Sequence, residues 1–199
     1  MRVFIDLGCY TGDTIAEAIV SVAPCAQYLG FEPIPDLFLQ CKKRFSKDKR
    51  VKILNLGIDK EPGKKKLYLD FYSETKTIGM GSTLMKSKST GRIKRSVQKG
   101  RYLIVKCIDI SKYIVDNFKL ADYLILKIDI EGKEYDVLEQ MIASGSIRYI
   151  RELYCEWHKD KMSGEIPEER HNGLISQLSA LFPLSGLGRQ DAFEAKDIV

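Results

Sequence analysis

Residues 3–14 read VFIDLGCYTGDT, and this stretch predicts the first structural unit of the chain. Val3 to Ile5 form a short run that is apolar on both faces, as in a strand buried within a parallel sheet. Asp13 and Thr14 are residue types that cap helices, and Glu17 stands where a capping box needs an acid. The stretch is therefore expected to form a strand, a tight loop and a helix.

The loop of this unit contains Gly8 and Gly12, with three residues between them. Glycine lets a ligand approach the backbone closely, and the start of a helix presents partly positive NH groups. Together these properties predict a binding site for a nucleotide-like cofactor, whose nature has to be inferred from the rest of the chain.

Length and composition favour a single domain over residues 1–199, because 199 residues with 44% hydrophobic content suffice for one sizeable core. No apolar run approaches the ~20 residues that cross a bilayer, and the charged start does not resemble a signal peptide. We expect a cytoplasmic protein without a membrane segment. The five cysteines are scattered and form no CxxC pair, which predicts reduced, buried thiols.

The formal charge of +5 is concentrated in one segment. Between Ser73 and Arg101, eight Lys or Arg residues accompany a single acid, Glu74, so this segment contributes +7 and the remainder −2. The segment is polar, contains glycine and shows little periodicity. We expect a long basic loop at about residues 73–101 that acts as a lid, since long loops within compact domains are usually functional or disordered.

Strand-like and helix-like stretches alternate along the chain, which predicts an α/β sheet. Beyond the first unit, strands are expected at residues 27–32, 51–55, 65–71, 102–108, 123–128 and 153–156. Helices are expected at residues 35–45, 111–118, 135–144 and 168–182. Two short extended pieces near Leu184 and Phe193 are expected to pair antiparallel at the sheet edge.

The loop after the first strand lacks the GxGxxG fingerprint of a diphosphate cradle. Glu32 ends the second strand, at the distance where an acid contacts ribose hydroxyls in nucleotide-binding folds. Asp6 would repel a diphosphate and attract a cationic group. A ligand with a ribose, an ammonium, a sulfonium and no phosphate fits these requirements, and S-adenosylmethionine is such a ligand.

Five stretches carry a resemblance to a known family: FIDLGCYTGDT, GFEPIP from Gly30, GMGSTL from Gly79, LKIDIEGKEYDVLEQM from Leu126, and YCEWH from Tyr154. In these the chain resembles the FkbM-type S-adenosylmethionine-dependent methyltransferases. The resemblance implies a Rossmann-like class I methyltransferase fold, with a mostly parallel seven-stranded sheet, helices on both faces and an antiparallel C-terminal edge. It also implies methyl transfer, commonly to oxygen, on sugars, glycans or other small hydroxylated acceptors.

Cofactor contacts are expected along the carboxyl edge of the sheet, where open α/β sheets bind their ligands. The expected set combines the first loop, the end of the second strand, the basic segment and the end of a later strand: Asp6, Gly8, Tyr10, Thr11, Gly12, Asp13, Glu32, Pro33, Ser82 and Asp129.

The reacting groups are expected at the ends of two strands. Glu156 and His158 are two residues apart in an extended segment and so share a face, while Trp157 points the other way. His158 has an ordinary pKa near neutrality, which suits a general base, and Glu156 would fix its tautomer. Asp129 completes the predicted catalytic set of His158, Asp129 and Glu156.

Acceptor contacts are expected from Lys127, Glu131, Trp157 and Arg92. Lys127 has a second interpretation as a structural ion pair with a neighbouring carboxylate. Asp129 and Glu156 have the oxygen ligands that Mg²⁺ takes, so a magnesium site is an alternative, but a metal-free site is preferred.

Three other functions have partial support in the sequence. Tyr72 and Lys76 have the YxxxK spacing of a short-chain dehydrogenase, but they fall at the end of a strand and not on a helix. The basic segment suits RNA and hence a 2′-O-methyltransferase, yet its charge is not interleaved with aromatic residues, which favours a small or glycan acceptor, including an anionic one. A non-catalytic binding module is disfavoured by the retained acids. Nothing in the sequence predicts an oligomeric state.

Overall fold

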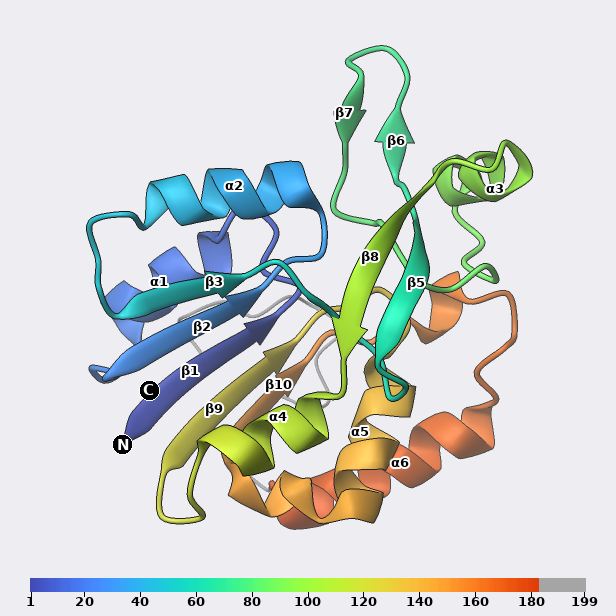
Figure 1. The fold of residues 1–199 in the computed structure, drawn as a ribbon. Helices are drawn as coiled ribbons and strands as arrows, with labels where there is room; N and C mark the ends of the chain where they lie inside the picture. The colour runs from blue at the N-terminus through green and yellow to red at the C-terminus, as the bar shows by residue number, and fades with distance from the viewer. Residues whose placement is uncertain (183–199) are drawn as a thin grey trace.

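The computed structural model describes residues 1–182 and shows an α/β fold built on a five-stranded, all-parallel sheet (Figure 1). The strand order is β10-β9-β1-β2-β3, so the chain starts in the middle of the sheet. The strands are β1 (Arg2–Leu7), β2 (Gln27–Phe31), β3 (Val51–Leu54), β9 (Tyr123–Ile128) and β10 (Ile150–Cys155). Because all five run the same way, their carboxyl ends meet at one edge.

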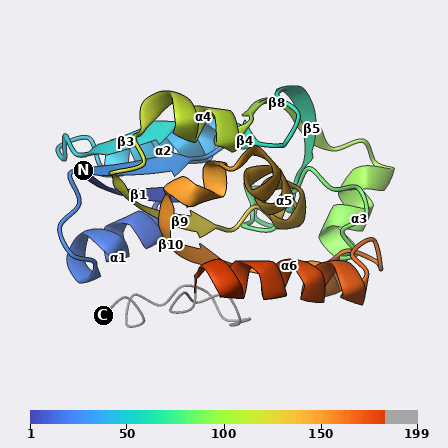
Figure 2. The same ribbon diagram turned by 90° about the horizontal axis from the view of Figure 1, so that it is seen from below.

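Helices cover both faces of this sheet, as the sequence predicts. Figure 2 shows α4 on one side of the sheet and α1 on the other. The α-helices outside the basic segment are α1 (Asp13–Ser21), α2 (Pro35–Arg44), α4 (Ile110–Asn117), α5 (Glu134–Ser144) and α6 (Glu168–Leu181), and two short 3-10 helices are η1 (Ser146–Tyr149) and η2 (Lys159–Lys161). These positions agree with the predicted helices to within a few residues.

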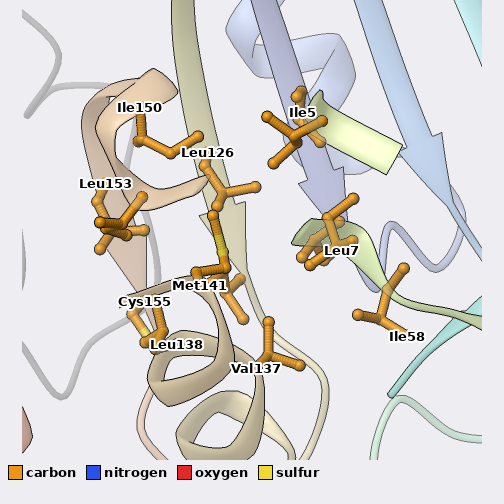
Figure 3. Packing of buried hydrophobic residues seen from close by; sticks show 14 of the residues in the cluster. Ile5, Leu7, Ile58, Leu126, Val137, Leu138, Met141, Ile150, Leu153 and Cys155 are labelled. Carbon is orange, nitrogen blue, oxygen red and sulfur yellow. The ribbon is translucent and has the colours of Figure 1, made fainter. Parts of the chain in front are cut away.

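The larger core lies between the sheet and helices α4, α5 and α6. Figure 3 shows Leu126 of β9 and Leu153 of β10 facing Leu138 and Met141 of α5, and all four side chains are fully buried. The strands β1 and β9 are buried along nearly their whole length, as expected for strands sandwiched between helices. A smaller core under α1 and α2 packs the opposite face.

A seven-stranded sheet is not confirmed: within residues 1–182 the main sheet has five strands, and the strand predicted at residues 102–108 does not join it. It forms β8 (Tyr102–Ile108) in a separate sheet of order β4-β8-β5, with β4 (Gly57–Ile58) and an antiparallel β5 (Gly63–Tyr68). In β8, buried Val105 and Cys107 alternate with exposed residues such as Ile104, which is 57% exposed. Such alternation suits a sheet with one solvated face and not a strand covered by helices on both sides.

The basic segment at residues 73–101 contains regular structure where a loop was expected. β6 (Phe71–Tyr72) pairs antiparallel with β7 (Thr77–Ile78), and this hairpin projects beyond the sheets (Figure 1). α3 (Gly91–Gln98) follows, anchored by the fully buried Ile93. A short basic helix is marginal alone, so burial of Ile93 is what stabilises it.

The start of α1 also differs from the expected capping. Gly12, with a φ of +84°, occupies the cap position, and no side chain caps the helix. Asp13 is the first helical residue, and its carboxylate accepts bonds from Thr11 Oγ1 at 2.7 Å and from Arg44 at 2.5 Å. A Cβ on Gly12 would lie 2.5 Å from the Phe45 ring, so glycine here permits α1 to pack closely against the end of α2.

The five cysteines are buried free thiols, as predicted. Within residues 1–182, no helix is both long enough and apolar enough to cross a membrane. The antiparallel pieces expected near Leu184 and Phe193 lie outside the described residues.

Candidate active site

Two adjoining cavities lie at the carboxyl edge of the parallel sheet. The first has a volume of about 80 Å³ and the second about 470 Å³. Both are lined by Met80, Asp129 and Glu131, so these residues mark the junction between the two cavities. A molecule in one cavity can therefore meet a molecule in the other beside Asp129.

The first loop lines one side of the smaller cavity, and three of its backbone NH groups already donate hydrogen bonds within the protein. The amides of Gly8 and Cys9 both donate to the carbonyl of Phe31, at 3.0 and 3.1 Å, and that of Tyr10 donates to Glu32 Oε2 at 3.0 Å. Amides engaged in this way do not cradle a phosphate, in agreement with the missing diphosphate fingerprint.

Position 8 requires glycine for a structural reason that is independent of any ligand. Its φ is +87°, and a Cβ at this position would lie 1.9 Å from the carbonyl oxygen of Asp129. Only glycine permits the loop after β1 to cross so close to the end of β9. Gly8 lines the smaller cavity, as the predicted cofactor role requires, but the packing alone already demands glycine.

Glu32 directly follows β2 and lines the smaller cavity, and two backbone amides hold its carboxylate in place. Oε1 accepts from the amide of Ile34 at 2.8 Å, and Oε2 accepts from the amide of Tyr10. Burial raises the pKa of Glu32 to about 7, partly offset by these two backbone bonds and reinforced by the charges of Asp6 and Asp129. Each oxygen keeps a second lone pair, so the carboxylate can accept hydroxyl donors from a ribose.

Asp6 is fully buried and lines neither cavity. Its Oδ1 lies 3.4 Å from Nζ of Lys127, which also bonds Oδ2 of Asp129 at 3.2 Å. Burial raises the pKa of Asp6, and the charge of Lys127 offsets only part of this rise. Burial lowers the pKa of Lys127, but the charges of Asp6 and Asp129 have the larger effect and raise the pKa of Lys127. Lys127 thus lies beside the Asp6 carboxylate, and the expected contact of Asp6 with a cofactor ammonium stays a prediction. Lys127 itself lines the larger cavity.

His158 lies 1% exposed among four carboxylates. Nδ1 is 2.7 Å from Glu134 Oε1, and Nε2 is 3.3 Å from Glu156 and from Glu131 and 3.8 Å from Asp129. Burial lowers the pKa of His158, but the bond to Glu134 and the carboxylates beside it prevail and raise the pKa to about 10.

This environment does not provide the near-neutral general base that the sequence predicts. An imidazole that keeps its proton at neutral pH has no lone pair to accept another. The sequence correctly predicted that Glu156 and His158 lie close together, although both follow the end of β10 and are not part of the strand. It did not account for the burial of His158 or for the carboxylates contributed by α5 and the loop before it.

Glu131 takes part in a buried ion pair that sequence reasoning missed. Lys88, only 2% exposed, pairs with its carboxylate and also donates to the carbonyl of Gly81 at 2.8 Å. Thr83 donates from Oγ1 to the carbonyl of Glu131 at 2.5 Å, and the backbone of Glu131 has a φ of +58°. Lys88 gave no signal in the sequence because one lysine within a basic segment is indistinguishable from its neighbours.

Arg92 lines the larger cavity from α3. Its guanidinium bonds both oxygens of the buried Asp70, at 2.5 and 3.2 Å, and lies 4.0 Å from the centre of the Tyr72 ring. Ser82, predicted as a cofactor contact, lines the smaller cavity and accepts from the amide of Asp70 at 3.0 Å. Asp70 thus holds Arg92 in position, a role that its place after a strand did not reveal.

The remaining predicted residues divide into two groups. Tyr10 and Pro33 line the smaller cavity, and Glu156 lines the larger one. Thr11, Gly12 and Asp13 line neither. Trp157 packs against the rings of Tyr135 and His171, at 5.0 and 5.5 Å between centroids, and also lines neither cavity, so the structure does not bring it to the predicted acceptor site.

The chain has a Rossmann-like α/β fold with two adjoining cavities at the carboxyl edge of its sheet. Residues 6–179 match the family model of the methyltransferase FkbM domain, and the chain therefore belongs to the FkbM methyltransferase family. Among curated proteins, no sequence matches this chain.

A solved structure is similar in fold. The crystal structure of methyltransferase FkbM from Methylobacillus flagellatus matches with a TM-score of 0.52 and 12% sequence identity. The match covers 92% of this chain and 39% of that one, so this chain spans about two fifths of the length of that protein. At this identity the likeness shows the fold alone.

Proposed function

We propose that this chain is an S-adenosylmethionine-dependent O-methyltransferase that acts on a hydroxyl of a sugar, glycan or similar small molecule. The observation that carries the proposal is the meeting of two cavities at Asp129, one holding Glu32 and the other lined by ionic side chains. A transferase needs this arrangement, because donor and acceptor have to be aligned within reach of each other.

The smaller cavity is the proposed donor site. Glu32 would accept the two ribose hydroxyls, and the engaged amides of the first loop suit a cofactor without phosphate. At about 80 Å³ the cavity is below the roughly 300–1,000 Å³ typical of whole ligand sites. Met80, 73% exposed, stands between the two cavities. Binding of the whole donor would therefore require the segment around Met80 to move outward.

The larger cavity is the proposed acceptor site. Its volume of about 470 Å³ falls within the usual range for small ligands. It is lined by cationic donors and by carboxylate acceptors, which together suit a molecule with several hydroxyls and a negative charge: Lys88, Arg92, Lys127 and Lys161, with Asp70, Asp129, Glu131 and Glu156.

S-adenosylmethionine would supply a methyl group bound to a positively charged sulfur. The protein has to exclude water, hold the acceptor hydroxyl in line with that methyl group and accept the proton of the hydroxyl. Asp129 and Glu156 present carboxylate oxygens at the right place for the last two tasks, since both line the larger cavity and Asp129 also borders the smaller one. Alignment alone can contribute roughly 7–11 kcal/mol in favourable cases.

The test incubates the purified full chain with isotope-labelled donor and a panel of glycans, nucleotide sugars and capped RNA, followed by mass spectrometry. Label on a sugar hydroxyl supports the proposal, whereas label on RNA alone would replace it by a nucleic-acid 2′-O-methyltransferase. Calorimetry provides a check that does not depend on the acceptor. S-adenosylhomocysteine, the demethylated product, is expected to bind, and binding of NAD in its place would overturn the donor assignment.

A further inference from the structure

We propose that Asp129, Glu156 and His158 bind a divalent cation, with Mn²⁺ as the best-suited ion, at the junction between the donor and acceptor cavities. From the sequence, a magnesium site formed by Asp129 and Glu156 was only an alternative, and a metal-free site was preferred. The structure adds His158 as a third ligand. The site is argued from its ligands alone, and only its role in the reaction rests on the proposed function.

The three side chains offer one ligand atom each, and these atoms all lie within 4.8 Å of one another. Nε2 of His158 is 3.3 Å from Glu156 Oε1 and 3.8 Å from Asp129 Oδ1. Two ligands at right angles around an ion, each about 2.2 Å from it, are about 3.1 Å apart. The Glu156 oxygen is already near that spacing, and the Asp129 oxygen would move about 0.7 Å closer, from 3.8 to about 3.1 Å, to fill a third position of the ion.

Both distances are longer than the about 2.7–2.9 Å of a strong bond between an imidazolium and a carboxylate. Nε2 has no hydrogen-bond partner among residues 1–182, although His158 is buried and carboxylate oxygens surround it. A buried polar atom without a partner is uncommon and calls for an explanation. An ion held between Nε2 and the two carboxylates provides one.

His158 is oriented as a metal-binding histidine. Its Nδ1 bonds Oε1 of Glu134 at 2.7 Å, which places the NH on Nδ1 and directs the other nitrogen toward Asp129 and Glu156. Glu134 is fixed in turn by the amide of Gly132, which donates to its oxygens at 2.9 and 3.0 Å. Metal-bound histidines commonly have such a carboxylate behind them, which sets the tautomer and the ring orientation.

The local charge also favours a cation. Five carboxylates gather here against three lysines, leaving two negative charges uncompensated when His158 is neutral: Asp6, Asp129, Glu131, Glu134 and Glu156, with Lys88, Lys127 and Lys161. All three lysines already lie beside carboxylates, Lys88 with Glu131, Lys127 with Asp6 and Asp129, and Lys161 with Glu156 at 3.9 Å. A divalent ion would balance the remainder.

The ligand set narrows the choice of ion. Carboxylates suit Mg²⁺ and Mn²⁺, imidazole suits Zn²⁺ and Fe²⁺, and Mn²⁺ accepts both kinds of ligand with an open coordination shell. Asp129 and Glu156 line the larger cavity, so the open positions would face the acceptor. An acceptor hydroxyl bound to the ion would lose its proton more readily, and the Glu156 oxygen that is not bound to the ion would take that proton, which a protonated His158 cannot do.

The experiment titrates Mn²⁺ into the chelator-treated 199-residue chain, with no donor or acceptor present, and follows the electron paramagnetic resonance of the free ion. We expect one bound ion per chain, with nitrogen coupling in spin-echo spectra. Asp129→Asn and Glu156→Gln should each weaken binding about tenfold or more, while Glu165→Gln, an exposed acid, should leave it unchanged. Circular dichroism verifies that each variant is folded.

No binding of Mn²⁺ by the wild-type chain at about 1 mM would overturn the site, and so would bound Mn²⁺ without nitrogen coupling or variants that bind like wild type. The role in catalysis is tested apart from the site. If the chain transfers methyl groups, chelation should abolish turnover and Mn²⁺ should restore it. Full turnover after chelation would overturn that role while leaving methyl transfer itself intact.

Discussion

Oε1 of Glu134 lies 2.7 Å from Nδ1 of His158, and both side chains are fully buried. Glu134 begins α5 and His158 follows β10, so this contact ties the helix to the end of the edge strand. Because the same carboxylate accepts from Gly132, one side chain joins three segments of the site.

We predict that Glu134→Ala lowers the free energy of unfolding by about 3–5 kcal/mol, because it leaves His158 and the Gly132 amide without their partner inside the protein. Glu139→Ala is the matched control on the same helix: Glu139 pairs with Arg170 at the surface, and its loss should cost less than about 1 kcal/mol. Denaturant unfolding of both variants measures the difference. Equal losses would show that the Glu134–His158 contact has no special weight.

Glu32 predicts the pH dependence of donor binding. Since burial holds its pKa at about 7, a proton competes with the ribose hydroxyls below that pH, and the ionised form that accepts them dominates above it. The facing charges are those of Asp6 and Asp129, both of which oppose ionisation. Affinity for S-adenosylhomocysteine should therefore rise about tenfold from about pH 6 to about pH 8 and then level off.

Glu32→Gln is the control for that titration. It should weaken binding by ~1–3 kcal/mol at about pH 8, as expected for loss of hydrogen bonds to a charged group, and remove the pH dependence. Calorimetry across the range makes the comparison. A Gln variant with the wild-type profile would assign the titration to another group.

Gly8 should tolerate no side chain. Gly8→Ala adds a Cβ that would lie 1.9 Å from the carbonyl oxygen of Asp129, at a φ of +87°. We expect a loss of roughly 2–5 kcal/mol in the free energy of unfolding, from backbone strain of ~1–2 and crowding of ~1–3. Gly145→Ala has a similar φ of +74° but open space around it, and should show the strain alone. Similar melting curves for the two variants would contradict the close approach.

Arg92 and Lys94 lie on the same short helix but differ in position. Arg92 lines the larger cavity and Lys94 does not. For an anionic acceptor, Arg92→Met should raise KM roughly tenfold and flatten the salt dependence, as expected when a charge-assisted contact is lost. Lys94→Met should change neither. If both variants shift KM alike, the basic segment acts through its overall charge and not through the cavity.

Hydrogen exchange can distinguish which part of residues 73–101 moves as a lid and which part is stably folded. Residues 91–98 form α3, whose Ile93 is fully buried, and should exchange slowly throughout. Residues 73–82 include the exposed tip between β6 and β7 and the exposed Met80, and should exchange fast in the free protein. We expect this part alone to slow when S-adenosylhomocysteine and acceptor are bound together. Unchanged exchange there would exclude it as a lid.

Local patterns in the sequence were sufficient for the strands of the main sheet and the helices that cover it. Val3 to Ile5 and the run at residues 123–128 are apolar on both faces, and this pattern alone indicates a strand between two helix layers. The position of Glu32 at the carboxyl edge of the sheet could also be predicted from local sequence, because the number of residues from the first loop to the end of the second strand can be counted along the chain.

Partners that are distant in sequence were decided by the tertiary structure. Lys88 and Glu131 are 43 residues apart and become a buried pair only when the basic segment packs on the loop after β9. In the same way Glu134 reaches His158 from 24 residues away. Their chemistry depends on burial and on neighbouring charges, which the sequence does not contain. The residue type of His158 thus suggested a base, whereas its surroundings keep it protonated or, with an ion bound, make it a ligand.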